Sequence, residues 1–270
     1  MQVIGICRFS YPAVGGFQVE HETIEDRMAY LYAPERMNAR FTLFEAFTLP
    51  CLRAQTDPDF IFVIVVGDSL PDTYLERLKH LIADIPQIKL QQHASGPHRS
   101  VMKNAIDAVR VSSKEPCLQF RLDDDDAFAV SFIETLRAKA ALARPLLREV
   151  RSIALDFNQG YIARPMAKGI EAAPVTAAYW SPALALMISS RADTSVMNFS
   201  HHKLWQRMPT VTFPGTDMML RGMNDFNDSR QKPAAKPAKM TLLTPKQEDY
   251  FRWTYNIDAD AVRAMTSSPQ

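Results

Sequence analysis

The sequence predicts an α/β protein built on a doubly wound sheet. Three observations indicate this class: short apolar runs alternate with amphipathic stretches, one run is continuously β-branched, and an acidic cluster directly follows another run. Continuous apolar runs are typical of strands covered on both faces, and their alternation with helices favours a sheet of this kind. A chain of 270 residues is long enough for one large α/β domain.

The alternation begins at the amino end of the chain. Residues 3–7 are apolar and predict a buried strand that leaves its sheet at Arg8. Residues 36–54 carry phenylalanines at near-helical spacing, and Pro50 must kink or end that helix. Residues 60–66 read FIFVIVV, which fits a strand covered on both faces.

The same order continues to the middle of the chain. Amphipathic helices are predicted over 72–85, 99–109 and 132–147, and strands over 88–92 and 117–122. The second half is less regular. Residues 152–157 and 161–165 flank Asn158-Gln159-Gly160 and predict a hairpin. Further strands are expected over 183–189 and 210–213, and a helix over 217–223.

Composition and charge exclude several classes of protein. Lys plus Arg is 31 and Asp plus Glu is 30, for a net charge of +1, so no nucleic-acid partner is predicted. Cys7, Cys51 and Cys117 lie far apart in apolar runs and indicate buried thiols in a reducing compartment. No apolar stretch reaches the roughly 20 residues of a membrane span. No basic region precedes the first apolar run, as it would in a secretion signal. A cytoplasmic protein is therefore expected.

Four consecutive aspartates, Asp123 to Asp126, follow the predicted strand at 117–122. Side chains alternate along an extended chain, so Asp123 and Asp125 can share one face. Converging carboxylates repel each other unless a cation lies between them. Hard oxygen ligands suit Mg²⁺ or Mn²⁺. The carboxyl ends of strands are also where open α/β sheets bind ligands.

Two other interpretations of these aspartates stand beside the metal site. Asp126 is well placed to cap the helix that follows, although capping needs one or two acids and not four. A calcium loop would use Asp123, Asp125 and Glu134, but Phe128 stands where that loop needs glycine.

Several stretches together resemble known glycosyltransferases. Residues 52–69, 96–104 and 121–126 resemble, in order, the "SQT…F…iivvDdgS" stretch, the "G…aRN" helix start and the D-x-D motif of GT-A glycosyltransferases. The opening Arg8-Phe9-Ser10 and the stretch 36–40 are similar to the bacterial rhamnosyltransferase-like family. The resemblance implies a GT-A fold, which is a Rossmann-like, doubly wound mixed sheet in a single domain with an irregular acceptor-side half.

The resemblance also implies roles for individual residues. Asp125 would be the main metal ligand, with Asp123 near the ribose and the metal. Arg8 ends the first strand, where such folds admit the nucleotide, and Asp68 would face the base or ribose. The nucleotide-sugar contacts expected in all are Arg8, Asp68, Arg99, Asp123 and Asp124.

The acceptor half supplies fewer candidates. His201 and His202 can complete a metal shell, although adjacent residues point apart and one surface histidine with one packed histidine is the alternative. Asp217 is the candidate base, since it resembles the second acid of an "ED" motif in which Thr216 replaces the Glu. A plain N-cap is its alternative. Asn224 stands where the family would place a histidine, which leaves its role open.

The predicted function is a metal-dependent, inverting glycosyltransferase that uses Mn²⁺ or Mg²⁺. Its donor is a nucleotide-diphosphate sugar, with rhamnose a candidate, and its acceptor a saccharide or a lipid-linked glycan. A nucleotidyltransferase is one alternative, but that class usually has a glycine-rich, lysine-containing loop after its first strand. The other is a non-catalytic carbohydrate- or metal-binding module on the same fold, which the replacements at Thr216 and Asn224 favour.

Four segments are expected along the chain. Residues 1–135 form the nucleotide-sugar half and 136–228 the acceptor half of the same domain. Residues 229–239 are basic and rich in Pro and Ala, which predicts a linker. The basic stretch would also suit a peripheral contact with the inner membrane. Residues 240–270 are expected to pack back on the body as a tail.

Overall fold

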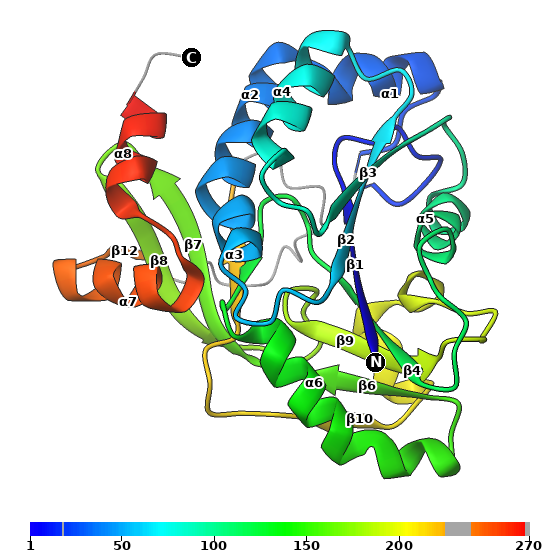
Figure 1. The fold of residues 1–270 in the computed structure, drawn as a ribbon. Helices are drawn as coiled ribbons and strands as arrows, with labels where there is room; N and C mark the ends of the chain where they lie inside the picture. The colour runs from blue at the N-terminus through cyan, green and yellow to red at the C-terminus, as the bar shows by residue number, and fades with distance from the viewer. Residues whose placement is uncertain (18, 225–238, 268–270) are drawn as a thin grey trace.

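A seven-stranded sheet forms the centre of the molecule, in a computed structural model that describes residues 1–17, 19–224 and 239–267 (Figure 1). In order across the sheet, its strands are β10 (Thr210–Thr212), β6 (Ser152–Asp156), β9 (Leu184–Ser189), β4 (Pro116–Arg121), β1 (Gln2–Arg8), β2 (Ile61–Gly67) and β3 (Ile88–His93). The four strands from β3 to β4 run parallel, and β9 runs antiparallel to both of its neighbours. The predicted α/β class with a doubly wound mixed sheet is confirmed.

Helices cover both faces of this sheet. The α-helices of the structure are α1 (Ile24–Leu31), α2 (Pro34–Leu43), α3 (Leu49–Arg53), α4 (Asp72–Ile82), α5 (His98–Asp107), α6 (Phe132–Ala143), α7 (Pro245–Tyr255) and α8 (Ala259–Ser267). Residues of α2, α3, α4 and α6 share one buried cluster with one face of the strands, and α1 and α5 share a second cluster with the other face. In β2, Phe62 and Ile64 face the first cluster while Val63 and Val65 face the second, which explains why the run is continuously apolar. Among the described residues, no helix is long and apolar enough to cross a bilayer.

The predicted helix over 36–54 continues past its proline. A π-helical turn over Phe44–Thr48 joins α2 to α3, and Pro50 lies in the first turn of α3. The interpretation that Pro50 must kink or end the helix is therefore only partly right. The π-helical turn shifts the hydrogen-bond register just before Pro50, which has no N–H to donate, and the chain stays helical.

The predicted hairpin at 152–165 is wrong. Strand β6 pairs with β9 and β10 in the large sheet. Strand β7 (Gln159–Met166) belongs to a second sheet, where it pairs with β8 (Gly169–Thr176). Gly160 is not a turn residue. A Cβ atom there would lie 1.8 Å from the carbonyl oxygen of Met219, so glycine is needed for the close approach of a neighbouring strand.

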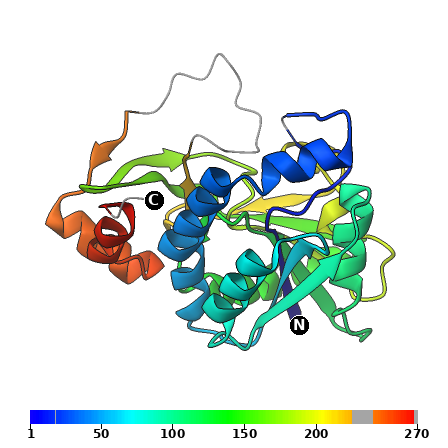
Figure 2. The same ribbon diagram turned by 90° about the horizontal axis from the view of Figure 1, so that it is seen from above.

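The second sheet has five strands. Their order is β12 (Thr241–Leu242), β8, β7, β11 (Met219–Gly222) and β5 (Ala127–Phe128). The helix predicted over 217–223 is wrong, because β11 is held between β7 and β5 by ladder hydrogen bonds on both sides. Helix α8 packs on β7 and β8, and Figure 2 shows α7 and α8 together at this side of the molecule. Of the predicted linker, residues 229–238 lie outside the described residues.

The acidic run connects the two sheets. Strand β4 ends at Arg121 in the large sheet, and β5 begins at Ala127 in the second. Residues 123–126 therefore make the crossing. Because β1 and β4 are parallel neighbours, with Ile6 opposite Arg121, the crossing lies beside the carboxyl end of β1 and hence beside Arg8. The topology thus brings together the two predicted donor-site segments.

Candidate active site

A cavity of about 1040 Å³ opens at the carboxyl ends of β1 and β4. Its wall is rich in charge of both signs. The arginines are Arg8, Arg40, Arg99, Arg121 and Arg221, and the acids are Glu20, Asp123, Asp125 and Asp126. The far wall is formed by residues 178–181 and 197–202 of the acceptor half. The cavity can therefore hold an anionic ligand and a cation side by side.

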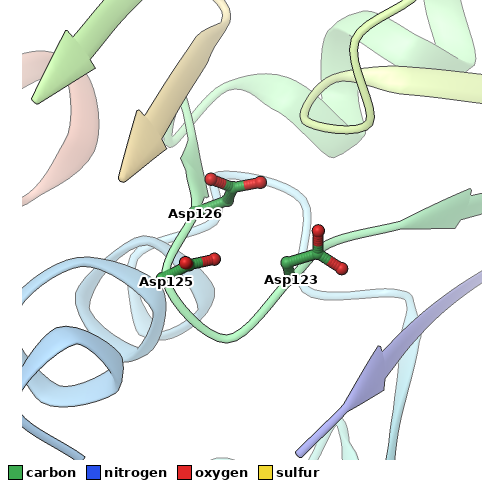
Figure 3. Close-up of side chains that lie close together, drawn as sticks. All are labelled: Asp123, Asp125 and Asp126. Carbon is green, nitrogen blue, oxygen red and sulfur yellow. The ribbon is translucent and has the colours of Figure 1, made fainter. Parts of the chain in front are cut away.

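Three of the four aspartates face this cavity. Side-chain oxygens of Asp123, Asp125 and Asp126 all lie within 4.8 Å of one another. A turn in which the Asp126 N–H donates to the Asp123 carbonyl oxygen over 3.1 Å folds the chain back on itself. Figure 3 shows Asp125 and Asp126 next to each other on the loop, with Asp123 across the turn. Three carboxylates at this spacing suit one divalent cation.

Burial sets the charge state of two of these acids. It raises the pKa of Asp125, which Arg40 opposes and Asp123 reinforces. Burial also raises the pKa of Asp126 well above its usual value, and the charges of Asp125 and Asp123 add to this. Ionised carboxylates here need a compensating charge, since each is desolvated and faces its neighbours. Bound Mg²⁺ or Mn²⁺ would provide that charge, so the acids fit such an ion.

Asp124 points the other way, into the protein. Its carboxylate is fully buried and accepts two hydrogen bonds from Arg40 of α2, one of them 2.9 Å long from Nε. The Arg40 Nη1 also lies 3.6 Å from Asp125 Oδ2. Asp124 does not line the cavity, so the structure does not bring it to the predicted nucleotide-sugar site. Its visible contact anchors the acidic turn.

The end of β11 supports the turn from the second sheet, through its last residue Gly222 and through Asn224 just beyond it. The Asn224 side-chain amide donates to Asp125 Oδ2 over 2.9 Å, and the Gly222 N–H donates to Asp126 Oδ1 over 3.0 Å. Asn224, whose role the sequence left open, thus orients the predicted main metal ligand. Such outer hydrogen bonds fix the direction of a ligating carboxylate.

Gly222 also has a steric role that can be tested. A Cβ atom there would lie 1.8 Å from the carbonyl oxygen of Asp125, which is backbone and cannot rotate away. We expect Gly222→Ala to displace the acidic turn and to destabilise the fold by about 1–3 kcal/mol, as overpacking typically does. Urea denaturation checks this. Gly215→Ala is the steric control, since nothing lies within 4 Å of its Cβ position, although its positive φ adds some strain. Equal stability of Gly222→Ala and wild type would contradict the steric role.

His201 lies on the far wall, and its tautomer follows from one contact. Its Nδ1 is hydrogen-bonded to the carbonyl oxygen of Tyr179, so Nδ1 carries the proton and Nε2 has the free lone pair. Burial lowers the pKa of His201 to about 4, and Arg121 contributes. His201 is therefore neutral near pH 7, as a ligand must be. His202 packs against it with ring centroids 4.1 Å apart. Neither histidine belongs to the close group formed by the three acids.

The donor-side arginines surround another histidine. Arg8 donates to the Gly16 carbonyl oxygen over 3.0 Å and lies 4.0 Å from the centre of the Phe17 ring. Burial lowers the pKa of His98 to about 3, and the charges of Arg8, Arg121 and Arg99 lower it further. This end of the cavity is therefore strongly electropositive and suits phosphate groups.

The low pKa of His98 predicts an acid-sensitive fold. Below pH 6.5 this histidine is protonated in the unfolded chain but stays neutral in the folded chain. The free energy of unfolding therefore falls as the pH falls from 6.5 towards 3. Between pH 7 and pH 4 the loss is at most about 3 kcal/mol. We expect His98→Gln to lose less stability over this interval than wild type. Urea denaturation at pH 7, 5.5 and 4 measures both slopes, and parallel slopes would contradict the assignment.

Besides Asp124, two further predicted residues lie outside the cavity lining. Asp68 follows β2, is exposed, and its N–H donates to the His93 carbonyl oxygen over 3.0 Å. Asp217 accepts a 2.7 Å hydrogen bond from Tyr250 of α7. It precedes Gly222 by five residues along an extended segment, which separates it from the acidic turn by roughly 15 Å.

Sequence reasoning gave no role to three cavity arginines. Arg40 and Arg121 lie within stretches quoted for the resemblance, and Arg221 lies 5.0 Å from the centre of the Trp180 ring. An arginine directly before an acidic run is a usable signal for Arg121. No pattern in the neighbouring sequence indicates the role of Arg40, because its partner Asp124 is 84 residues away in the chain.

A family model and several solved structures are similar to this chain. A family model described as "Putative rhamnosyl transferase" matches residues 2–236. No curated protein matches the chain. Among solved structures, Staphylococcus aureus TarS residues 1–349 in complex with UDP-GlcNAc has 13% identity over 84% of this chain, with a TM-score of 0.45. This chain spans 60% of that TarS fragment.

Two other solved structures are similar at a comparable distance. A 4-diphosphocytidyl-2C-methyl-D-erythritol synthase from Anaerococcus prevotii has 11% identity over 80% of this chain and 89% of its own, with a TM-score of 0.35. A nucleotide-diphospho-sugar transferase from Desulfovibrio desulfuricans, titled putative, has 12% identity over 83% of each chain, with a TM-score of 0.33. Structures this distant do not indicate which substrate this chain uses.

Proposed function

The chain belongs to the Putative rhamnosyl transferase family of glycosyltransferases, and we propose that it transfers a sugar from a nucleotide-diphosphate donor with the help of a divalent cation. One observation carries the proposal. Three carboxylates, with oxygens within 4.8 Å of one another, share a cavity with five arginines. A nucleotide-diphosphate sugar presents a pyrophosphate, which is the group that such a pairing of a cation with arginines recognises.

In the transfer, one bond to the anomeric carbon forms and one bond to it breaks. The acceptor hydroxyl oxygen attacks this carbon, the bond to the diphosphate oxygen breaks, and the nucleoside diphosphate leaves with the electron pair. The hydroxyl proton passes to a base. Positive charge develops on the sugar and negative charge on the leaving diphosphate. Arg8, Arg99 and Arg121 line the cavity and are placed to stabilise that negative charge.

The proposed cation site uses Asp123, Asp125 and Asp126, with Mn²⁺ or Mg²⁺ as the ion. A bound ion there would neutralise charge on the diphosphate. Of the two predicted histidine ligands we favour His201, because its hydrogen bond to Tyr179 leaves Nε2 free to coordinate. The chain's own residues orient the acids: Arg40 and Asn224 both contact Asp125.

The finer assignments also stay proposals. Rhamnose is the proposed sugar on the family description, the outcome at the anomeric carbon is proposed to be inversion, and the acceptor is a saccharide, free or lipid-linked. Residues 1–135 and 136–228 are proposed as donor and acceptor halves, since the cavity wall takes residues from both.

Asp217 remains the base proposed from the sequence, and one variant tests it. A general base at this position requires Asp217→Asn to lower kcat by about 10²–10⁴-fold while the dissociation constant of the donor stays unchanged. Steady-state kinetics together with calorimetric titration of the nucleotide give both quantities. Tyr250→Phe is the matched control, since it removes the hydrogen bond to Asp217 and leaves the carboxylate in place. A kcat equal to that of wild type would remove Asp217 from the chemistry.

The function itself is tested by donor turnover. The purified chain is incubated with dTDP-rhamnose or UDP-GlcNAc, a panel of saccharide acceptors, and Mn²⁺ or Mg²⁺, and the release of nucleoside diphosphate is measured. We expect acceptor-stimulated release with one donor, lost on addition of EDTA and restored by the metal. Tight metal-dependent binding without turnover of any donor would favour the non-catalytic module. Release of inorganic pyrophosphate from a nucleoside triphosphate would favour a nucleotidyltransferase.

A further inference from the structure

A second, smaller groove adjoins the proposed active site. Its volume is about 240 Å³, and its six lining residues are Arg99, Asn198, Phe199, Ser200, Lys203 and Arg207. Three of these six, Arg99, Phe199 and Ser200, also line the main cavity, so the two spaces meet at a common wall. The other cations come from the 3₁₀ segment His201–Gln206 and the residue after it, in the acceptor half.

The charge of this groove is entirely positive. Its lining holds three cationic side chains and no acid. All three are exposed. Within residues 1–17, 19–224 and 239–267, no acidic side chain forms an ion pair with any of them. Four exposed arginines elsewhere each have one: Arg53, Arg77, Arg144 and Arg252. The whole chain has a net charge of only +1, so this concentration of charge is local.

The donor does not account for Lys203 and Arg207. A nucleotide-diphosphate sugar carries two negative charges on its pyrophosphate, and the main cavity already offers the proposed divalent ion and several arginines. Lys203 and Arg207 lie outside that cavity. Adjacent like charges without counter-ions favour a second anion, which gains charge-assisted hydrogen bonds there.

We infer that the acceptor is an anionic saccharide, and that this groove binds its phosphate or carboxylate group with Lys203 and Arg207. The inference rests on the proposed function, because it assigns the acceptor of that reaction. An acid group held in the groove leaves the rest of the acceptor directed at the common wall and hence at the donor sugar. Phosphate and carboxylate share the recognition chemistry, so the experiment has an arm for each.

The test uses three disaccharides of the same ring composition: one neutral, one with a uronic acid and one with a phosphate monoester. Their dissociation constants are measured by calorimetry on the full chain without donor. We expect the anionic disaccharides to bind at least 10-fold more tightly than the neutral one at low salt, with the advantage falling as salt is added. Whichever anion binds better identifies the natural acid group.

Variants locate the binding. Lys203→Ser/Arg207→Ser should weaken binding of the anionic disaccharides at least 10-fold and leave the neutral one unchanged. Lys168→Ser/Lys246→Ser removes two exposed cations from the second-sheet side and should change nothing. Equal affinity for all three disaccharides, or full anion binding by the groove variant, would overturn the inference. So would an oligonucleotide that displaces the disaccharide, since the groove would then be a general phosphate site.

Donor assays separate the two proposals. The groove variant should bind nucleoside diphosphate with Mn²⁺ as tightly as wild type, because neither changed residue lines the main cavity. Selective loss of the anionic acceptor with intact donor binding supports the groove. Absence of donor turnover by the wild type, with anion binding in the groove intact, would refute the proposed function alone.

Discussion

Asp125→Asn is expected to remove sugar transfer almost completely while leaving the fold intact. Asp125 is one of the two buried acids of the cluster, and its loss takes a full charge from the proposed cation site. Metal stabilisation of a leaving phosphate is worth several kcal/mol, so we expect kcat to fall by about 10²–10³-fold or more. Binding of nucleoside diphosphate should also cease to depend on Mn²⁺. Donor turnover and calorimetry measure the two effects.

The metal-free stability of Asp125→Asn should not fall with its activity. Burial and Asp123 raise the pKa of Asp125, so its charge is a cost to the metal-free fold. An asparagine side-chain oxygen can still accept the hydrogen bond from Asn224. We therefore expect the melting temperature without metal to equal or exceed that of wild type. Asp193→Asn, at a fully exposed position, is the control for loss of one acid. Wild-type kcat in Asp125→Asn would end the metal role of this residue.

Arg40→Met is expected to be the most destabilising single change considered. Its guanidinium binds the fully buried Asp124 with two hydrogen bonds and also approaches Asp125. Burial raises the pKa of Asp124 to about 7 even though Arg40 opposes this. Without the arginine, a desolvated carboxylate stays unpaired, which typically costs about 3–5 kcal/mol. Urea denaturation at pH 7.5 measures the loss.

The deficit of this variant should depend on pH with a definite sign. Removing Arg40 raises the folded-state pKa of Asp124 further above its unfolded value. An acid with a raised folded pKa contributes stability at low pH and loses it as the pH rises through that pKa. The difference in free energy of unfolding between wild type and Arg40→Met should thus be smaller at pH 5 than at pH 7.5. Arg53→Met is the matched control: it breaks a similar two-bond pair with Asp84 at the surface, which is worth about 1 kcal/mol or less. Equal losses in the two variants would contradict the buried role.

Most of the large sheet could be predicted because its signals are local. A strand buried on both faces must be apolar at every position, so FIFVIVV at 60–66 identified β2 to within one residue at each end. The second sheet could not be predicted in this way. The local pattern predicts the wrong partner for β7, no strand at β8 and a helix at β11. Pairing in this sheet joins residues up to 93 positions apart, since Leu220 of β11 lies opposite Ala127 of β5.

Some residues of the candidate site could likewise be predicted from a local sequence pattern, and others could not. Asp123 and Asp125 could be proposed as metal ligands because four adjacent acids are an unusual local pattern, and the structure places both in the cavity. Asp126 could not be separated from Asp124 by sequence. Alternation along a strand assigns both to one face, but β4 ends at Arg121, and the turn from Asp123 to Asp126 directs Asp126 to the cavity and Asp124 to Arg40.

The sequence by itself determined the chemistry available to this protein: an acidic run after a buried strand, arginines at strand ends, and a chain that alternates strand and helix. Only the tertiary structure decided which charges meet. It paired Asp124 with Arg40, aimed Asn224 at Asp125, and left Lys203 and Arg207 without an acidic partner among the described residues. The physical reason is range. The apolar pattern and the hydrogen-bond period of a strand or helix are set by residues that are neighbours in the chain. The partner of a charged side chain is instead the group nearest to it in space, and that depends on how distant segments pack.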